Sequence, residues 1–288
     1  YHPSTRKIMY VISGSTHQRL GASLAEEMDA EFCGVVNRHF PDGERYIRIL
    51  MDVDGQDVVV VQNTFPDKKI VELLLILQAV KEAGAKTVTC VVPYMGYSRQ
   101  ERIFQAGEAR SAKAIARVLG SMCDRIFTIN IHTPAVLDFF GCEAKDINGS
   151  REVVRYLKGF KPDMVVAPDE GAKARCTLAA SMLKVPVHVM KKVRIDGRTV
   201  ETSSGPVDVK GCTAVILDDI ISTGGTIATA ANILRDGGAE RILAACTHGL
   251  FIEDAANRLR VCDDILSSDT LEGVYTRFSV APVIADAL

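Results

Sequence analysis

The sequence predicts a doubly wound α/β protein that is built as two domains. Apolar, β-branched runs alternate with segments of helical period along almost the whole chain. These runs are nearly continuous in Val, Ile and Leu, which is typical of parallel strands covered by helices on both faces. The same rhythm of strand, helix and strand occurs in both halves, so we expect two similar domains with central, mainly parallel sheets.

The first series of elements fills the first half of the chain. Strands are expected where apolar runs are bounded by turn residues, and helices where apolar residues recur every three or four positions. The expected strands span residues 8–13, 34–40, 46–50, 57–63, 87–93 and 125–130. The expected helices span residues 17–28, 68–83 and 111–120.

A second series follows a polar segment at residues 148–151, Asn-Gly-Ser-Arg, which we interpret as the seam between domains 1–147 and 148–288. A turn containing glycine within residues 194–201 predicts a hairpin or flap beside the second sheet. The expected strands of this series span residues 164–168, 187–191, 213–220 and 242–247. The expected helices span residues 172–183, 225–236 and 253–259.

Composition excludes several classes of protein. Of the 288 residues, 47% are hydrophobic and 24% are charged, and no window has the roughly 18 apolar residues of a membrane span. The formal charge of −2 provides no global field that would attract nucleic acid. The eight cysteines are scattered without a C-x-x-C pair, and residues 1–7 lack the apolar core of a signal peptide. We therefore expect a cytoplasmic protein with reduced thiols, in contact with neither membrane nor nucleic acid.

The most informative motif is an apolar run that ends in the acidic pair Asp218 and Asp219 and is followed by a turn that opens a helix. Two carboxylates at a sheet edge can accept hydrogen bonds from the vicinal hydroxyls of a sugar. The hydroxyls and backbone N–H groups of the turn suit a phosphate monoester at the helix N-terminus. A solvated turn with an acidic N-cap is the alternative. The turn consists of Ser222, Thr223, Gly224, Gly225 and Thr226.

A second loop repeats this design after the strand at residues 164–168. Its backbone amides, with Lys173 and Arg175 nearby, are expected to hold a second anionic group, a diphosphate. Ordinary helix N-capping by Asp169 is the alternative. The loop consists of Asp169, Glu170, Gly171 and Ala172.

Two segments of the first half contain groups that suit a nucleotide. One is a turn at residues 40–44, Phe-Pro-Asp-Gly-Glu, which a plain type I turn explains equally well. The other follows the strand at residues 87–93, so Arg99, Gln100 and Arg102 are expected at the carboxyl edge of a sheet, where ligands bind. Arginine side chains with an amide suit the recognition of polyphosphate and base.

Basic residues at the ends of two further strands are the remaining candidates for the functional site. His132 follows the strand at residues 125–130, and a packed or capping role is its alternative. The strand at residues 187–191 ends in Lys191 and leads through Lys192 and Arg194 into the expected flap. These cations would neutralise charge that develops on a phosphoryl group; the alternative is a charged strand edge that prevents aggregation.

Taken together in this order, the motifs resemble those of ribose-phosphate diphosphokinases, the synthetases of phosphoribosyl pyrophosphate (PRPP). The resemblance covers nearly the whole chain and is closest to the compact archaeal type. It implies a tandem of two phosphoribosyltransferase-like domains. It also implies transfer of the diphosphoryl group of ATP to the C1 hydroxyl of ribose 5-phosphate. The motifs lie at residues 40–44, 97–102, 168–171 and 218–226 and at His132.

The resemblance also implies a role for each motif. Asp218 and Asp219 would hold the ribose hydroxyls, the turn at residues 222–226 the 5-phosphate, and residues 169–172 the diphosphate. His132 and Asp169 would help to position Mg²⁺ bound to ATP. Arg99, Gln100 and Arg102 would contact the nucleotide. Adenine would be contacted by a neighbouring subunit, which implies a homo-oligomer, through Phe40, Asp42, Gly43 and Glu44.

The family pattern K-x-R selects Lys192 and Arg194 as the catalytic cations. Arg194 would also contact ribose 5-phosphate. Lys191 is the alternative to Lys192 as the catalytic lysine. The sequence departs from the family at residues 169–172, which have one glycine where many members have two, and at Ser222, which replaces a common aspartate. Two other functions use the same motifs. A phosphoribosyltransferase would consume PRPP, and a non-catalytic homologue would sense it.

Overall fold

The computed structural model describes residues 9–194, 200–203 and 208–288, except for the side chains of residues 191–194 and 200–203. The chain forms two compact units. Unit 1 runs to Asn148 and also contains Val280–Leu288, whereas unit 2 is Gly149–Ser279. The sequence assigned all residues from 148 to 288 to the second domain, and the return of the last segment to unit 1 corrects that assignment.

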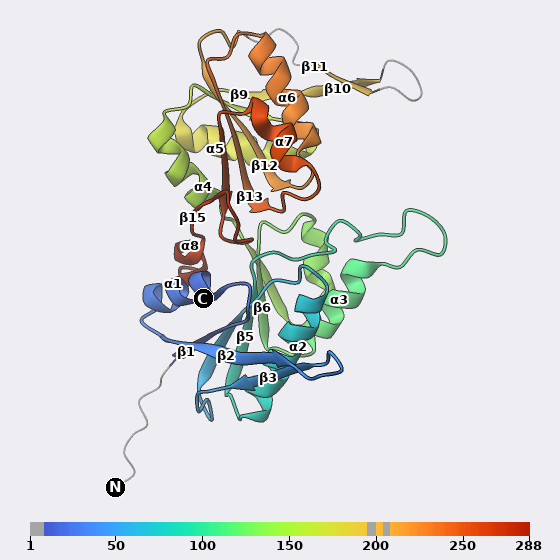
Figure 1. The fold of residues 1–288 in the computed structure, drawn as a ribbon, viewed down its shortest axis with the longest axis vertical. Helices are drawn as coiled ribbons and strands as arrows, with labels where there is room; N and C mark the ends of the chain where they lie inside the picture. Colours follow the sequence, from blue (N-terminus) through green and yellow to red (C-terminus); the bar gives the residue numbers. More distant parts are fainter. Residues whose placement is uncertain (1–8, 195–199, 204–207) are drawn as a thin grey trace. The chain divides into compact units, whose positions relative to one another are not determined.

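Unit 1 contains a sheet in the order β3-β2-β1-β4-β5-β6-β7, in which only β3 is antiparallel to its neighbour (Figure 1). The order reverses between β1 and β4, the place where doubly wound sheets bind ligands beyond the carboxyl ends of their strands. The strands are β1 (Met9–Ser13), β2 (Glu31–His39), β3 (Arg45–Ile49), β4 (Asp57–Val61), β5 (Thr87–Val92), β6 (Arg125–Ile129) and β7 (Glu143–Ile147).

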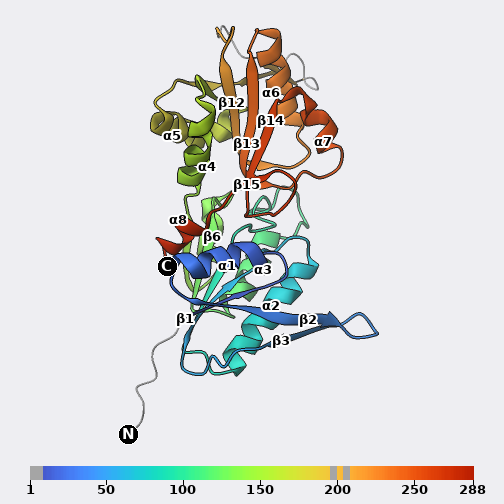
Figure 2. The same ribbon diagram turned by 60° about the vertical axis from the view of Figure 1, so that its left-hand side comes forward.

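Helices cover both faces of this sheet. The helices α2 (Lys68–Glu82) and α3 (Ser111–Gly120) bury Leu73, Ile76 and Leu119 on one face, where the short helix η1 (Pro134–Phe139) also packs. On the other face, α1 (Gln18–Glu27) packs beside α8 (Ala281–Ala285), as Figure 2 shows. Apolar residues of α8, including Ile284, share a core with those of α1, including Leu24, which explains why the C-terminal segment belongs to unit 1.

Unit 2 contains an all-parallel sheet in the order β15-β14-β13-β12-β8-β9. The order reverses between β8 and β12, so these two strands flank the expected ligand position. The strands are β8 (Met164–Ala167), β9 (Val187–Val189), β12 (Thr213–Ile221), β13 (Arg241–Gly249), β14 (Asp264–Ser268) and β15 (Thr276–Phe278).

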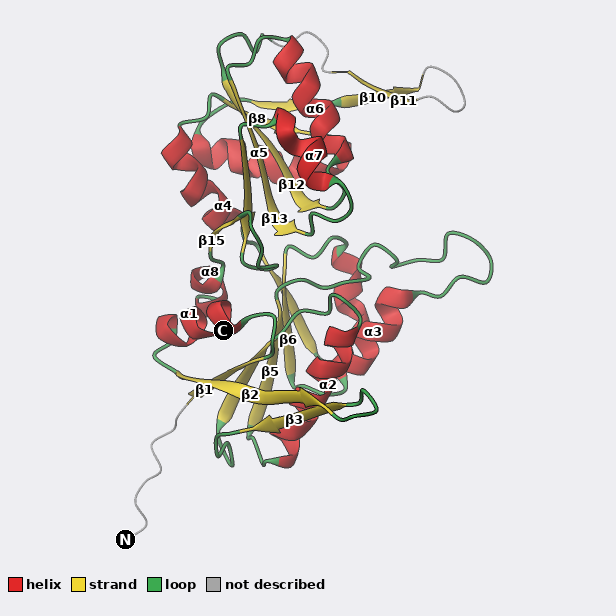
Figure 3. Cartoon of the chain, in the orientation of Figure 1, coloured by secondary structure: helices red, strands yellow, loops and turns green. Residues whose placement is uncertain are grey.

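Helices also cover both faces of the second sheet (Figure 3). One face carries α4 (Ser150–Leu157) and α5 (Lys173–Leu183), and the other carries α6 (Gly225–Asp236). The remaining helices are short: η2 (Lys158–Phe160), η3 (Glu170–Ala172), α7 (Ala255–Arg258) and η4 (Leu259–Val261).

The expected hairpin after β9 is present as two antiparallel strands, β10 (Lys191–Arg194) and β11 (Val200–Ser203). Lys192 pairs with Thr202 and Arg194 with Val200 in the backbone register. The rest of the predicted flap, residues 195–199, lies outside the described residues, as do the side chains of Lys191, Lys192 and Arg194.

Most predicted elements lie within a few residues of the observed ones, but β7, β14, β15 and α8 were not predicted. Helices α3 and α6 have the predicted bounds. Within the part of the chain that the structure describes, no helix is both long and apolar enough to span a bilayer.

Candidate active site

The two acidic loops of unit 2 meet because their strands are neighbours. Strands β8 and β12 pair in parallel, with Ile216 opposite Val166, so the loop after β8 and the acidic pair of β12 lie near the same end of the sheet. Strand β12 continues through Asp218 and Asp219 to Ile221, one residue further than the sequence predicted. The loop at residues 169–172 and the acidic pair therefore lie together at the point where the strand order reverses.

Arg175, from the first turn of α5, forms ion pairs with both carboxylates of the acidic pair. Its Nη1 lies 2.9 Å from Asp218 Oδ1, and its Nη2 lies 3.1 Å from Asp219 Oδ2. The side chain of Asp219 is only 5% exposed, compared with 19% for Asp218. A planar guanidinium suits this two-point contact and fixes both carboxylates. We expected Arg175 near an anionic ligand, whereas in this structure it contacts the acids.

The charge state of Asp218 depends on these neighbours. Burial, followed by the adjacent carboxylate of Asp219, raises the pKa of Asp218 to about 7. The positive charge of Arg175 and a hydrogen bond of 2.8 Å from the Asp219 N–H oppose this rise. Near neutral pH the pair therefore exchanges a proton readily, and its ability to accept hydrogen bonds from hydroxyls depends on pH.

The turn at residues 222–226 leads directly into α6. Gly224 is the N-cap and has φ of +75°, a left-handed conformation that favours glycine, and a Cβ there would lie 3.0 Å from Leu259 Cγ. Two backbone carbonyls of the turn also accept hydrogen bonds from the segment that follows β13. The Ile252 N–H donates to Ser222 O at 3.1 Å, and Arg258 Nη1 donates to Thr223 O at 3.0 Å. The first N–H groups of α6 are thus presented by a fixed loop, as an anion site requires.

In the loop after β8, helix N-capping, the alternative role of Asp169, is observed. Asp169 caps η3, and its Oδ1 accepts a hydrogen bond from the Ala172 N–H at 3.2 Å. Lys173 Nζ lies 2.8 Å from Glu170 Oε1, so this cation also contacts a carboxylate. Glu170 and Gly171 are exposed and Asp169 is half-buried, which leaves the loop accessible to a ligand.

In unit 1, the 40–44 turn connects β2 to β3 and is exposed throughout. The Phe40 N–H donates to Glu44 O at 2.8 Å, and the Gly43 N–H donates to Phe40 O at 2.9 Å. The ring of Phe40 packs edge-on against Tyr46, with centroids 5.7 Å apart, and remains 45% exposed. The turn thus presents an aromatic ring and two carboxylates, those of Asp42 and Glu44, to solvent.

The segment after β5 is held by Glu108, which the sequence did not single out. Glu108 Oε2 accepts hydrogen bonds from the N–H groups of Phe104 and Gln105, at 2.8 and 3.0 Å, and from Gln100 Nε2 at 3.2 Å. These bonds lower the pKa of Glu108. Arg99 and Arg102 are exposed, and Gln100 positions the segment in this structure.

His132 is exposed in the loop after β6. Asp146 shapes this loop, since its Oδ1 accepts from the Ile131 N–H at 2.9 Å and from Thr128 Oγ1 at 2.7 Å. Desolvation of its carboxyl group raises the pKa of Asp146, although both hydrogen bonds act in the opposite direction. The loop therefore holds His132 at the carboxyl end of β6, as the sequence predicted.

A metal site built by protein alone consists of clustered His, Cys, Asp and Glu side chains. Among the described residues, no cluster of three or more His, Cys, Asp or Glu side chains could hold a metal ion. Mg²⁺ differs from zinc in that it is usually bound through one or two carboxylates together with substrate phosphates and water. The half-buried carboxylate of Asp169 fits that mode of binding.

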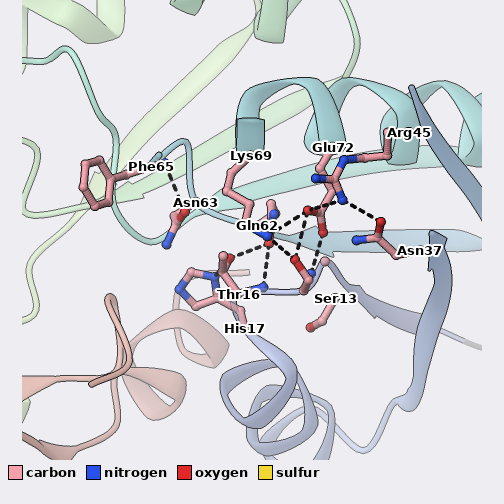
Figure 4. Close-up of polar contacts among 12 residues, drawn as sticks. Ser13, Thr16, His17, Asn37, Arg45, Gln62, Asn63, Phe65, Lys69 and Glu72 are labelled. Carbon is pink, nitrogen blue, oxygen red and sulfur yellow. Dashed lines mark hydrogen bonds and ion pairs between the residues drawn. The ribbon is translucent and has the colours of Figure 1, made fainter. Parts of the chain in front are cut away.

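Sequence reasoning missed a cluster of polar side chains at the place where the strand order of unit 1 reverses (Figure 4). Its centre is Glu72 of α2, which is completely buried and contacts Ser15, Arg45 and Lys69. The signal was visible in the sequence, because position 72 lies on the apolar face of a predicted helix.

The fold defines a two-domain α/β protein of the phosphoribosyltransferase type, and sequence comparisons identify its family. Residues 9–122 match the model of the N-terminal domain of ribose phosphate pyrophosphokinase, and residues 145–279 match the phosphoribosyl transferase domain. The chain is 40% identical to a ribose-phosphate pyrophosphokinase of Methanopyrus kandleri over 97% of its length and 98% of the relative. The corresponding enzyme of Methanothermobacter thermautotrophicus is 38% identical, over 96% and 99%.

A solved structure agrees with these relatives. The phosphoribosylpyrophosphate synthetase of Mycobacterium smegmatis superposes with a TM-score of 0.84 at 29% identity, covering 98% of this chain and 97% of that one. The chain belongs to the ribose-phosphate pyrophosphokinase family. It is a transferase that makes PRPP, and a phosphoribosyltransferase function is not favoured.

Proposed function

We propose that PRPP is made here by transfer of the β,γ-diphosphoryl group of ATP to the C1 hydroxyl of ribose 5-phosphate, with release of AMP. One observation supports this assignment most directly. The acidic pair Asp218 and Asp219 lies beside the fixed turn at residues 222–226, on the strand next to the loop at residues 169–172. The site therefore offers acceptors for two hydroxyls and N–H donors for two anionic groups.

The sugar is held by both parts of the unit 2 site. The carboxylates of Asp218 and Asp219 accept hydrogen bonds from the ribose hydroxyls, and the turn at residues 222–226 binds the 5-phosphate. The loop at residues 169–172 binds the diphosphate being transferred. These contacts place the C1 hydroxyl toward the incoming β-phosphorus, and positioning of this kind accounts for much of the rate enhancement in phosphoryl transfer.

The nucleotide is bound by unit 1 residues. Arg99, Gln100 and Arg102 contact the base and phosphates, and His132 and Asp169 help to hold Mg²⁺ on the ATP. When bound, Mg²⁺ neutralises negative charge on the phosphates. Lys192 and Arg194 of β10 stabilise charge on the transferred group, and Arg194 also contacts ribose 5-phosphate.

The 40–44 turn contacts the adenine bound by a neighbouring subunit, so the active enzyme is a homo-oligomer. The exposure of Phe40, Asp42 and Glu44 is consistent with contacts outside their own unit. A cytoplasmic location also belongs to this proposal, and the eight free thiols are consistent with a reducing compartment.

The decisive test incubates the protein with ATP, Mg²⁺ and ribose 5-phosphate and measures AMP by chromatography. We expect AMP to form only when the sugar is present, together with an equal amount of PRPP. Ribose without the phosphate is the control, because it cannot use the turn at residues 222–226. Absence of sugar-dependent AMP under varied metal and phosphate conditions would contradict the proposed function.

The pH dependence of catalysis is expected to report the ionisation of Asp218, as a fall of kcat/KM on the acid side of the profile (the acid limb). Ionised Asp218 accepts hydrogen bonds from hydroxyls, so kcat/KM for ribose 5-phosphate should fall as the pH drops below about 7. In Arg175→Met the attraction that favours the ionised form is lost, so this acid limb should move to higher pH.

The exposed cation Lys158 of the same unit provides a control, and Lys158→Met should leave the profile unchanged. An acid limb at the same pH in Arg175→Met and the unmodified enzyme would contradict the assignment.

A further inference from the structure

Glu72 is a fully buried carboxylate at the centre of an ion-pair cluster in unit 1 (Figure 4). It lies on the buried side of α2 with Leu73 and Ile76. Its oxygens accept hydrogen bonds from the Ser15 N–H at 2.6 Å and from Ser15 Oγ at 2.9 Å, while Lys69 Nζ lies 3.1 Å away. Arg45 Nη1 lies 3.2 Å from Glu72 Oε2.

The cluster keeps Glu72 ionised. Burial alone would raise the pKa of Glu72, but the hydrogen bonds from Ser15 and Lys69 and the charge of Lys69 outweigh it and lower the pKa. A buried ion pair is seldom more stable than apolar residues of the same size. A cluster of this kind is therefore weak evidence of stabilisation, and its geometry suggests another use.

Arg45 links Glu72 to the 40–44 turn. It is the first residue of β3 and directly follows Glu44, and its side chain is 8% exposed. Its Nη1 also donates to Asn37 Oδ1 of β2 at 2.5 Å. Arg45 thus ties both strands of the hairpin to α2 at the point where the turn ends.

Arg45 and the end of the 40–44 turn border a groove beside α2, with a volume of about 440 Å³. Gly43, Glu44 and Arg45 line it from the hairpin, and Val71 and Leu75 line it from α2. Without the charge of Glu72, Arg45 would lose its fixed partner on α2, and the end of the turn would be free to shift across this groove.

We propose that Glu72 is a positioning residue for nucleotide binding, which fixes the 40–44 turn by holding Arg45 against α2 and the loop after β1. The inference rests on the proposed function, in which this turn contacts adenine. Glu72 itself touches no substrate in this scheme. Its effect reaches ATP only through Arg45 and the turn.

The test is Glu72→Gln, which keeps the side-chain shape and removes the charge. We expect KM for ATP to rise on the order of 10-fold, whereas KM for ribose 5-phosphate changes by less than about twofold, because the sugar site belongs to unit 2. A matched control is Glu82→Gln, an exposed position at the end of the same helix, which should leave both constants unchanged.

Arg45→Met provides a second variant in case Glu72→Gln does not fold, as judged by circular dichroism. It leaves Ser15 and Lys69 in contact with Glu72 and should raise KM for ATP by a similar factor. The double variant should be no worse than either single variant, because both changes break the same link. A purely structural role of Glu72 would not separate the two KM values in this way.

The outcomes distinguish the inference from the function on which it rests. If the unmodified protein forms no AMP that depends on the sugar, the proposed function fails. If the unmodified protein is active but Glu72→Gln or Arg45→Met leaves KM for ATP unchanged, or raises both KM values equally, the inference alone is overturned. Multiplying effects in the double variant would overturn it as well.

Discussion

Lys192→Ala should lower kcat by on the order of 10²-fold or more while KM for ribose 5-phosphate changes little. The expected loss is large because phosphoryl transfer needs little covalent help from the protein and depends on cations that stabilise charge in the transition state. The acidic pair and the turn at residues 222–226 are untouched by this change, so the sugar should still bind. Steady-state AMP release with saturating ATP, followed by titration of ribose 5-phosphate, separates the two constants.

Lys191→Ala is the matched control for this variant. The family pattern K-x-R fits Lys192 and Arg194, whereas Lys191 lies outside it. We therefore expect Lys191→Ala to retain most of its kcat. An unchanged rate in Lys192→Ala, or a large loss in Lys191→Ala, would move the catalytic role to another cation.

The sequence predicted those elements whose signal is local. Helices α3 and α6 have their predicted bounds because helical periodicity is continuous between clear turn residues. Strand β7 was missed because it is mostly exposed and polar, Glu-Ala-Lys-Asp-Ile, so it contains no apolar run. Strand β15 spans only Thr276–Phe278, which is too short to give a periodic signal.

The position of α8 could not be predicted for a different reason. Its residues are apolar, but nothing in a short segment specifies which distant surface it will cover. The observed contact joins Ala281 and Ile284 to Leu20 and Leu24 of α1, near the other end of the chain. Long-range docking of this kind depends on the assembled core. The predicted boundary instead assigned every residue after 147 to the second domain, including α8.

The sequence predicted which loops form the candidate site, but not which side chains contact one another within it. Motifs at the ends of parallel strands must meet at one sheet edge, which is why the loop after β8 and the acidic pair of β12 lie together. The contact of Arg175 with Asp218 and Asp219 depends on how α5 packs, and no spacing in the sequence specifies it. Glu72 could have been found, since an acid on an apolar helix face needs a partner.

The double variant Asp218→Asn, Asp219→Asn should lower kcat/KM for ribose 5-phosphate by on the order of 10³-fold. A hydrogen bond to a charged acceptor contributes about 1.5–3 kcal/mol, and the variant weakens two of them. Each single variant should therefore lose about 10- to 100-fold. The control is Asp236→Asn at the exposed end of α6, which should retain full activity. Circular dichroism would verify folding, because each change deprives Arg175 of a carboxylate.

The single variants should also differ from each other in their pH dependence. The charge of Asp219 helps to raise the pKa of Asp218, so in Asp219→Asn the acid limb of kcat/KM should move below its position near pH 7. In Asp218→Asn the group that titrates is gone, and the limb itself should disappear. Near-normal kcat/KM for ribose 5-phosphate in either folded variant would remove the acidic pair from the sugar site. An acid limb that persists in Asp218→Asn would instead assign the titration to a different group.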